Sequence, residues 1–181
     1  MLRTLFLVLL LTNTPQMICA ESEINPTVQY DEDLGFNHLG GGLSHLEDFK
    51  GKLLLVHFWA TWCGSCIQEM PSLREFNASL KEKKIHLLMV STDFGSGSTL
   101  KKFLHDKDME AFDVVQDPQL AQYFNVRGIP TTIIINSKGQ EIDRLVGPVN
   151  WQSDDMKEKL EKLVAYNEAL KTPEKKDKPD A

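Results

Sequence analysis

A nearly unbroken apolar segment from Leu53 to Trp59, followed closely by a pair of cysteines, constrains this chain more than any other feature. A largely apolar run that contains a single histidine is typical of a central strand covered on both faces. From about Cys66 to Lys83, apolar residues recur at spacings of three and four, which predicts a helix with Pro71 inside it. The cysteines therefore lie where a buried strand gives way to a helix.

The rest of the chain alternates between strand and helix patterns. Further apolar runs predict strands at Ile85–Ser91 and Thr131–Ile135 and an antiparallel edge strand at Glu141–Val146. Capping residues and periodicity predict helices that begin at Ser98, Asp117-Pro118 and about Ser153, and a short helical turn capped by Ser44 and Glu47. The order favours an α/β fold with a central mixed sheet and helices on both faces, built as β-α-β and then β-β-α with an insert.

The N-terminus has the pattern of a secretory signal peptide over residues 1–20. Arg3 precedes the apolar run Leu5–Leu11, which is too short for a membrane-spanning helix of about 20 residues. Cys19 would permit lipid attachment, but Ile18 stands where that processing prefers a small residue. We therefore expect cleavage after Ala20 and a periplasmic or otherwise extracytoplasmic location, with lipid or membrane anchoring as the less favoured alternative.

The remaining chain divides by composition into three parts. Residues 21–42 are polar and acidic, and we expect them to form a loosely ordered N-terminal lead-in. Residues 43–170 carry the strand and helix patterns of the folded domain, and residues 171–181 have the composition of a disordered charged tail. The net charge of -6 argues against a basic surface for nucleic acid.

The cysteine pair is the strongest chemical signal in the chain. Loss of the signal peptide leaves only Cys63 and Cys66, too few for a framework of structural disulfides. Two thiols three positions apart at the start of a helix can close a disulfide with little backbone movement, and the helix N-terminus stabilises a thiolate. We interpret Cys63 as the exposed, attacking thiol and Cys66 as the thiol that resolves the mixed disulfide.

Other uses of two cysteines fit the sequence less well. A structural zinc site would need two further ligands, and the histidines are scattered along the chain: His38, His45, His57, His86 and His105. Covalent haem attachment would need a histidine directly after Cys66, where Ile67 stands. An inert disulfide across so small a loop would constrain the unfolded chain little. We therefore expect redox chemistry without a metal or cofactor.

Three motifs together resemble a known family. They are the segment from Val56 to Cys66, the triplet Glu69-Met70-Pro71 and the segment Gly128-Ile129-Pro130-Thr131. From about Leu43 to Val164 the chain is similar to the secreted TlpA/ResA/CcmG-type thiol-disulfide oxidoreductases of the thioredoxin fold. This resemblance implies reduction of protein disulfides outside the cytoplasm. It also implies clients such as the cysteine pair of apo-cytochrome c, and electrons from a membrane thiol relay of the DsbD or CcdA type.

The resemblance also suggests roles for residues around the cysteines. It implies that the Ile129-Pro130 bond is cis and packs against the cysteine pair, so that the Ile129 backbone can pair with an extended client segment. Glu69 would modulate the thiol pKa values, although a solvated acid is the simpler interpretation. His57 stands where general thioredoxins often place a buried aspartate, and it either handles the Cys66 proton or is a satisfied core histidine. Trp62, next to Cys63, is a further candidate modulator.

The residues between the cysteines indicate the direction of the reaction. Strong oxidants of this fold often carry a histidine there, whereas this chain has Gly64-Ser65, which favours a reductant. Two alternatives remain open: an oxidase or isomerase on the same fold, and a redox-regulated binding module or metal chaperone without catalytic turnover.

Overall fold

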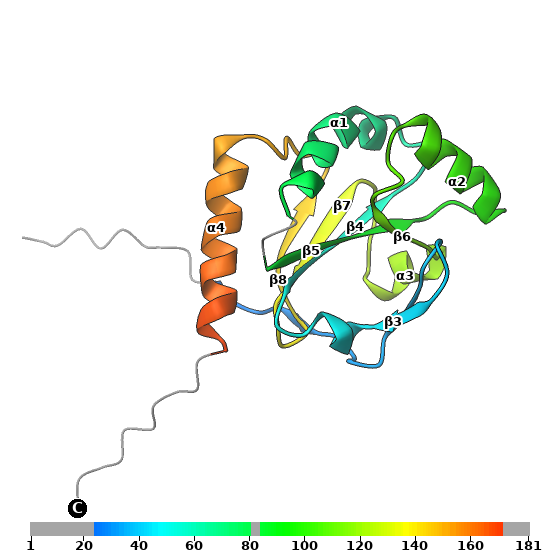
Figure 1. The fold of residues 1–181 in the computed structure, drawn as a ribbon. Helices are drawn as coiled ribbons and strands as arrows, with labels where there is room; N and C mark the ends of the chain where they lie inside the picture. Colours follow the sequence, from blue (N-terminus) through cyan, green and yellow to red (C-terminus); the bar gives the residue numbers. More distant parts are fainter. Residues whose placement is uncertain (1–23, 81–83, 172–181) are drawn as a thin grey trace, which may run out of the picture.

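The computed structural model describes residues 24–80 and 84–171; the predicted signal peptide and the charged tail beyond Lys171 lie outside these ranges. Strands β1 (Val28–Gln29), β4 (Leu53–Trp59), β5 (Ile85–Ser91), β6 (Asp113–Gln116), β7 (Thr131–Ile135) and β8 (Gln140–Val146) form one sheet. Their order across the sheet is β1-β8-β7-β4-β5-β6. Figure 1 shows how the strands and helices are arranged. Strands β2 (Gly35–Asn37) and β3 (Leu43–His45) form a separate antiparallel pair.

The sheet is mixed, as predicted. β4 lies at its centre, parallel to β5 and antiparallel to β7. Helices α1 (Gly64–Ala78), α2 (Gly97–Asp106) and α4 (Asp154–Ala169) contribute to the apolar core on one face. The short helix α3 (Pro118–Tyr123) and the 3-10 turn η1 (Leu46–Phe49) contribute to the core on the other. The α/β class with helices on both faces is therefore confirmed.

All residues of β4 are buried, because both faces of this strand are covered. Its side chains alternate between the two cores: Leu55 and Trp59 belong to the core that contains α1, whereas Val56 and Phe58 belong to the opposite one. This alternation directs His57 towards α1. The central strand thus places a titratable side chain on the face that also carries the helix after the cysteines.

Several expected local details were wrong. Ser96, rather than Ser98, caps α2 and accepts a hydrogen bond from the Ser98 backbone N–H at 3.2 Å. At η1, the Asp48 carboxylate accepts from the backbone N–H of His45 at 2.7 Å, one position beyond the predicted Ser44 and Glu47 pair. Strand β8 is not a free edge over its whole length, because β1 pairs with its first two residues.

The expectation of a loosely ordered lead-in was wrong for residues 24–42. Tyr30 and Phe36 are buried in the core that contains α3, and β1 extends the sheet. The Tyr30 hydroxyl donates to Glu141 on β8, and its ring lies 4.6 Å from that of Phe124. Strand β6, in the segment that the sequence presents as an insert, was also missed.

Candidate redox site

The two cysteines form a disulfide at the start of α1. Their sulfur atoms are 2.09 Å apart, and Cys63 is the N-cap residue of the helix. The chain leaves β4 at Trp59 and turns through residues 60–62, with the Cys63 backbone N–H donating to the Ala60 carbonyl at 3.2 Å. The disulfide therefore lies at the carboxyl end of the central strand, where the sequence predicted a junction between strand and helix.

Polar hydrogens surround the sulfur of Cys63. The Cys66 backbone N–H donates to Cys63 Sγ at 3.2 Å, and Ser65 Oγ lies 3.5 Å from the same atom. In the dithiol form, these donors and the N-terminus of α1 favour a thiolate at Cys63. Cys63 is the more accessible cysteine, but at 6% exposure against 1% for Cys66 it is far less exposed than expected.

The loop before β7 forms the other wall of the site. The Ile129-Pro130 peptide bond is cis, which confirms the expectation for this position. The Ile129 carbonyl oxygen lies 3.8 Å from Cys63 Sγ, while the Pro130 carbonyl accepts from the Gly147 N–H at 2.9 Å. The backbone of Ile129 is thus the part of this loop that faces the accessible sulfur.

Glu69 is buried beneath the site, at 5% exposure, so the interpretation of it as a solvated acid is wrong. Its Oε2 accepts a hydrogen bond from the Val149 backbone N–H at 2.8 Å. Its Oε1 lies 3.2 Å from His57 Nε2 but has no hydrogen-bond partner, because the two groups are not aligned for one. A carboxylate one turn after Cys66 is therefore held inside the protein with one oxygen unsatisfied.

His57 is enclosed on several sides. Its Nδ1 lies 2.8 Å from Thr132 Oγ1, its Nε2 faces Glu69, and its ring meets that of Trp151 edge to face at 6.1 Å. These contacts agree with the interpretation of His57 as a satisfied core histidine. They also place an imidazole and a carboxylate next to each other in the layer below the disulfide.

The loop that carries Trp62 is hydrogen-bonded to the segment that follows β5. The Asp93 carboxylate accepts from Thr61 N–H at 3.0 Å, from Thr61 Oγ1 at 2.7 Å and from Ser91 Oγ at 2.7 Å. Trp62 itself is 70% exposed. The Trp62 ring therefore lies in solvent next to Cys63, on a loop that the hydrogen bonds between Thr61 and Asp93 hold in place.

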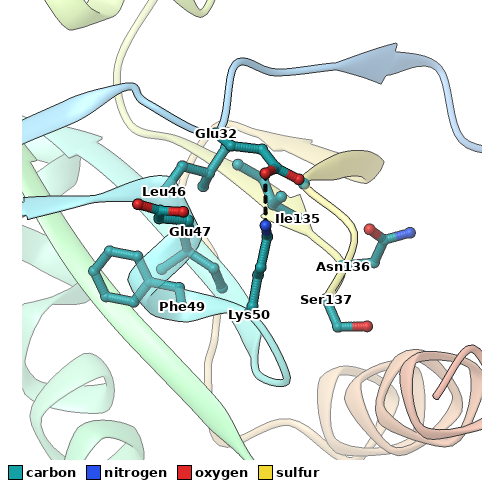
Figure 2. Close-up of a pocket in the computed structure, with 10 residues that line it drawn as sticks. Glu32, Leu46, Glu47, Phe49, Lys50, Ile135, Asn136 and Ser137 are labelled. Atoms are coloured by element: carbon teal, nitrogen blue, oxygen red, sulfur yellow. Dashed lines mark hydrogen bonds and ion pairs between the residues drawn. The ribbon is translucent and has the colours of Figure 1, made fainter.

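Two hollows in the molecule lie away from the cysteines. The first has a volume of about 10 Å³, and Figure 2 shows it beside the ion pair of Lys50 Nζ and Glu32 Oε2, which are 2.6 Å apart. That volume suits roughly one water molecule. The second, about 530 Å³, lies between α1 and α4 and is lined by residues that include Phe76 and Trp151.

No cluster of His, Cys, Asp or Glu suited to a metal ion occurs among the described residues. His38 and His86 do converge, but on a single carboxylate, that of Asp113. Within the described ranges, no helix is long and apolar enough to cross a membrane.

Sequence reasoning missed three contributors to the site: Thr132, Val149 and Asp93. A signal existed for each. Thr132 follows the Pro130-Thr131 motif directly, and Val149 lies in the segment Gly147–Trp151, within the part of the chain that resembles the family. Asp93 follows β5, and the carboxyl ends of neighbouring parallel strands meet at one edge of a sheet. What the sequence could not supply was their pairing with His57, Glu69 and Thr61.

Comparison with known proteins shows which proteins the chain is similar to. The chain is 32% identical to the thioredoxin-like protein YneN of Bacillus subtilis, over 74% of this chain and 78% of YneN. It is 31% identical to the thiol-disulfide oxidoreductase ResA of Bacillus thuringiensis, over 70% of this chain and 69% of ResA. A solved structure from Chlorobium tepidum, proposed to be the thiol:disulfide interchange protein DsbE, matches with a TM-score of 0.63 and 28% identity, over 80% of this chain and 98% of that one.

The resemblance inferred from the motifs is confirmed by these relatives. The model of the AhpC/TSA family matches residues 31–141, which include both cysteines and the cis proline. The matched segment, the paired cysteines and the named relatives together show that the chain belongs to the AhpC/TSA family and is a thiol-disulfide oxidoreductase of the thioredoxin fold.

Proposed function

We propose that this enzyme reduces protein disulfides outside the cytoplasm, with Cys63 as the attacking thiol and Cys66 as the resolving thiol. The observation that carries the proposal is the disulfide at the N-terminus of α1, whose more accessible sulfur lies 3.8 Å from the Ile129 carbonyl. The apo-cytochrome c cysteine pair is the proposed client, and a membrane thiol relay of the DsbD or CcdA type is the proposed electron donor. Gly64-Ser65, without a cation between the cysteines, favours the reducing direction.

The first step is attack of the Cys63 thiolate on one sulfur of the client disulfide. A bond forms between Cys63 Sγ and that sulfur, and the other client sulfur leaves as a thiolate and takes up a proton. Hydrogen-bond donors around Cys63 Sγ stabilise the thiolate before attack. The backbone of Ile129, beside the cis Pro130, would hold the client segment in an extended conformation next to the sulfur.

The second step releases the client. The Cys66 thiolate attacks Cys63 Sγ, the intramolecular disulfide closes, and the second client sulfur leaves as a thiolate. The client gains two electrons and two protons, and the enzyme is left in the disulfide form seen in the structure. A further cycle then needs two electrons from an external dithiol, which is the role proposed for the membrane relay.

Glu69 and His57 are proposed to position and exchange the proton of Cys66. Glu69 lies one helical turn after Cys66, and His57 Nε2 is 3.2 Å from its free oxygen. A carboxylate near Cys66 disfavours a thiolate at Cys66, because two negative charges would then lie close together. The Cys66 thiolate therefore forms readily only when its proton can pass to a nearby group. Trp62, 70% exposed beside Cys63, is proposed to influence how partners approach the sulfur.

The extracytoplasmic location rests on the sequence of residues 1–20, which is proposed to be a signal peptide cleaved after Ala20. Lipid attachment at Cys19 is the alternative. Mass spectrometry of the N-terminus of the exported protein separates these outcomes, because a processed chain begins at Glu21 and a lipidated chain begins at a modified Cys19.

Substitution of each cysteine tests the proposed roles. The Cys66→Ser variant should accumulate a mixed disulfide between Cys63 and a client, because the resolving sulfur is gone. The Cys63→Ser variant should form no such adduct and should not turn over. Non-reducing electrophoresis with mass spectrometry measures both, and Cys66→Ser protein that completes repeated turnovers would refute the resolving role.

A further inference from the structure

His57 and Thr132 lie opposite each other in the centre of the sheet. They are paired residues of the antiparallel strands β4 and β7, so their side chains lie on the same face. His57 Nδ1 is 2.8 Å from Thr132 Oγ1, and each of the two residues is only 1% exposed. Because bulk water does not reach them, the hydrogen-bonding groups of this pair must find their partners within the protein.

The hydroxyl of Thr132 decides which of the two atoms donates. A neutral imidazole carries one hydrogen, on Nδ1 or on Nε2, whereas a hydroxyl both donates and accepts. Within residues 24–80 and 84–171, Thr132 Oγ1 has no hydrogen-bond partner besides His57 Nδ1. If Nδ1 donated, the hydroxyl hydrogen would be buried without an acceptor, which is costly. The arrangement that satisfies both groups has Thr132 as the donor and His57 Nδ1 as the acceptor.

The other ring nitrogen of His57 leads to the same assignment. Nε2 lies 3.2 Å from Glu69 Oε1, a buried oxygen that no donor satisfies among the described residues. A lone pair on Nε2 would face the lone pairs of this oxygen, whereas a hydrogen on Nε2 faces an acceptor that lacks a donor. Rotation of the ring by half a turn would place carbon atoms against both Thr132 and Glu69, so the ring orientation is fixed as well.

The remaining neighbours of the His57–Glu69 pair are uncharged. The ring of Trp151 meets the imidazole edge to face at 6.1 Å, and the backbone N–H of Val149 donates to Glu69 Oε2 at 2.8 Å. The Thr132 hydroxyl is the polar group that β7 contributes. The titratable groups that face one another beneath the disulfide are therefore His57 from β4 and Glu69 from α1, with the cysteines one turn before Glu69.

We propose that Thr132 is a positioning residue that holds His57 in the tautomer with its hydrogen on Nε2, directed towards Glu69. In this form His57 has no free lone pair, because Nε2 carries a hydrogen and Nδ1 accepts from Thr132. The imidazole therefore does not take up the Cys66 proton itself. It partly neutralises the carboxylate near Cys66, and this favours the Cys66 thiolate that resolves the mixed disulfide.

This inference rests on the proposed function and divides the roles proposed there. Glu69 is the group that exchanges the Cys66 proton, and His57, held by Thr132, acts through Glu69. The two parts fail separately. A Cys66→Ser chain that traps no client contradicts the proposed roles of the cysteines, whereas the tautomer of His57 is measured in a chain that retains both cysteines.

NMR of the ring nitrogens measures the tautomer directly. The full chain carries Cys19→Ser and isotope-labelled histidine, and the His57 signals are assigned by their loss in His57→Gln. At neutral pH we expect an unprotonated Nδ1 and a protonated Nε2 in the oxidised chain. A hydrogen on Nδ1 instead, or on both nitrogens, overturns the inference without any substitution of Thr132.

Substitution of Thr132 tests its effect on the resolving thiol. Thr132→Val retains the branched shape but removes the hydroxyl, so the Nδ1 signal should shift and the ring should lose its fixed position. Because the Glu69 charge is then less neutralised, we expect the pH midpoint of Cys66 alkylation in the reduced chain to rise by about half a unit. Thr132→Ser, which keeps the hydroxyl, should restore the parent midpoint. Equal midpoints for Thr132→Val and the parent chain overturn the proposal.

A double variant separates positioning from packing. In a Glu69→Gln chain the carboxylate is absent, so Thr132→Val should cause no further change in the Cys66 midpoint. A change as large as in the parent chain would mean that the hydroxyl acts independently of Glu69, against the proposal.

Thr131→Val is the matched control. Thr131 is 2% exposed, its Oγ1 donates to the Gly128 carbonyl at 2.7 Å, and it lies on the opposite face of β7 from Thr132. The loss of this buried hydrogen bond should leave the ring-nitrogen signals of His57 unchanged. Equal changes of these signals in Thr131→Val and Thr132→Val would assign the effect to repacking of β7 and overturn the positioning role.

Discussion

At the scale of single residues, Glu69 and His57 are two buried titratable side chains whose hydrogen bonding is incomplete. Both side chains are nearly inaccessible, and each has one well-placed hydrogen-bond partner, the Val149 N–H for Glu69 and Thr132 Oγ1 for His57. The remaining pair of atoms, Glu69 Oε1 and His57 Nε2, face each other at 3.2 Å without a hydrogen bond. A buried oxygen without a donor carries a cost of about 1–3 kcal/mol, and the role proposed for Glu69 in proton exchange at Cys66 would account for that cost.

Replacement of the carboxylate by its neutral isostere isolates this effect. Glu69→Gln keeps an oxygen for the Val149 N–H but removes a buried negative charge one turn from Cys66. A thiolate at Cys66 then forms more readily, so the pH midpoint of Cys66 alkylation in the reduced protein should fall by about one unit. Quantitative mass spectrometry of the peptide that carries Cys66 measures the midpoint.

The control for this substitution is Glu75→Gln, which neutralises an exposed acid on the same helix. It should leave the alkylation profile unchanged. Identical profiles for the parent chain and Glu69→Gln would mean that Glu69 has only a packing role.

At the scale of elements, the β2–β3 hairpin is attached to the edge of the sheet through one carboxylate. His38, just after β2, and His86 on β5 both bond Asp113 on β6, and the Leu39 N–H donates to the Val114 carbonyl at 2.7 Å. Burial raises the pKa of Asp113, but the hydrogen bonds from His86 and His38 outweigh it and hold this pKa below its ordinary value. Folding therefore favours the ionised carboxylate.

This shift predicts a sensitivity to acid. Because the folded-state pKa of Asp113 is lowered, its stabilisation is complete above the ordinary carboxyl pKa of about 3.9 and is lost as the pH falls through and below that value. Asp113→Asn should lower the free energy of unfolding by about 1 kcal/mol at neutral pH, and the difference should disappear towards pH 3. Urea unfolding at several pH values tests this, with the exposed Asp33→Asn as control; a difference that does not change with pH would contradict it.

A second attachment, at the other side of the sheet, fixes the N-terminal segment. Arg144 donates to Glu141 through Nε at 2.7 Å and through Nη2 at 2.8 Å, and the same carboxylate accepts from the Tyr30 hydroxyl. Arg144→Met would leave the buried Glu141 charge without its cation, so we expect a loss of about 3 kcal/mol in the free energy of unfolding.

The matched control is Lys157→Met, which breaks an exposed pair with Asp154 at 3.4 Å. Exposed pairs contribute about 0–1 kcal/mol, so this variant should unfold close to the parent. Equal effects of Arg144→Met and Lys157→Met in urea unfolding would show that the Arg144–Glu141 contact does not anchor the segment.

These two attachments explain which elements the sequence could predict. β4, β5 and β7 have the bounds expected from their apolar runs, because strands buried on both faces leave a local pattern. Tyr30 and Phe36 are isolated apolar residues in an acidic stretch, and their burial depends on partners such as Phe124 and Phe49, which are remote in sequence. The paired cysteines and cis Pro130 were predictable from their motifs, whereas the contacts of His57 with Thr132 and Glu69 required the register of three elements.

At the scale of the whole molecule, redox chemistry and folding are linked. The difference in unfolding free energy between the disulfide and dithiol forms equals the difference in reduction potential of the cysteine pair between the folded and unfolded chain, with about 1.4 kcal/mol for each 30 mV. A strong oxidant of this fold is one whose reduced form is stabilised. The stability difference therefore reports whether folding makes the cysteine pair more reducing or more oxidising than the unfolded pair.

The structure points to a more stable disulfide form. Reduction would place two thiols, one of them 1% exposed, near a buried carboxylate whose Oε1 lacks a hydrogen-bond donor, and no cationic side chain lies between the cysteines to stabilise a thiolate. We expect the oxidised chain to unfold at a higher guanidinium concentration than the chain in dithiothreitol. The free energy of unfolding of the oxidised chain should be larger by about 1–4 kcal/mol. The double variant Cys63→Ser with Cys66→Ser should show no dependence on dithiothreitol, which assigns the difference to this pair. A reduced form more stable than the oxidised one would make the enzyme an oxidant, because the same folding energy would then drive electrons from clients into the cysteine pair.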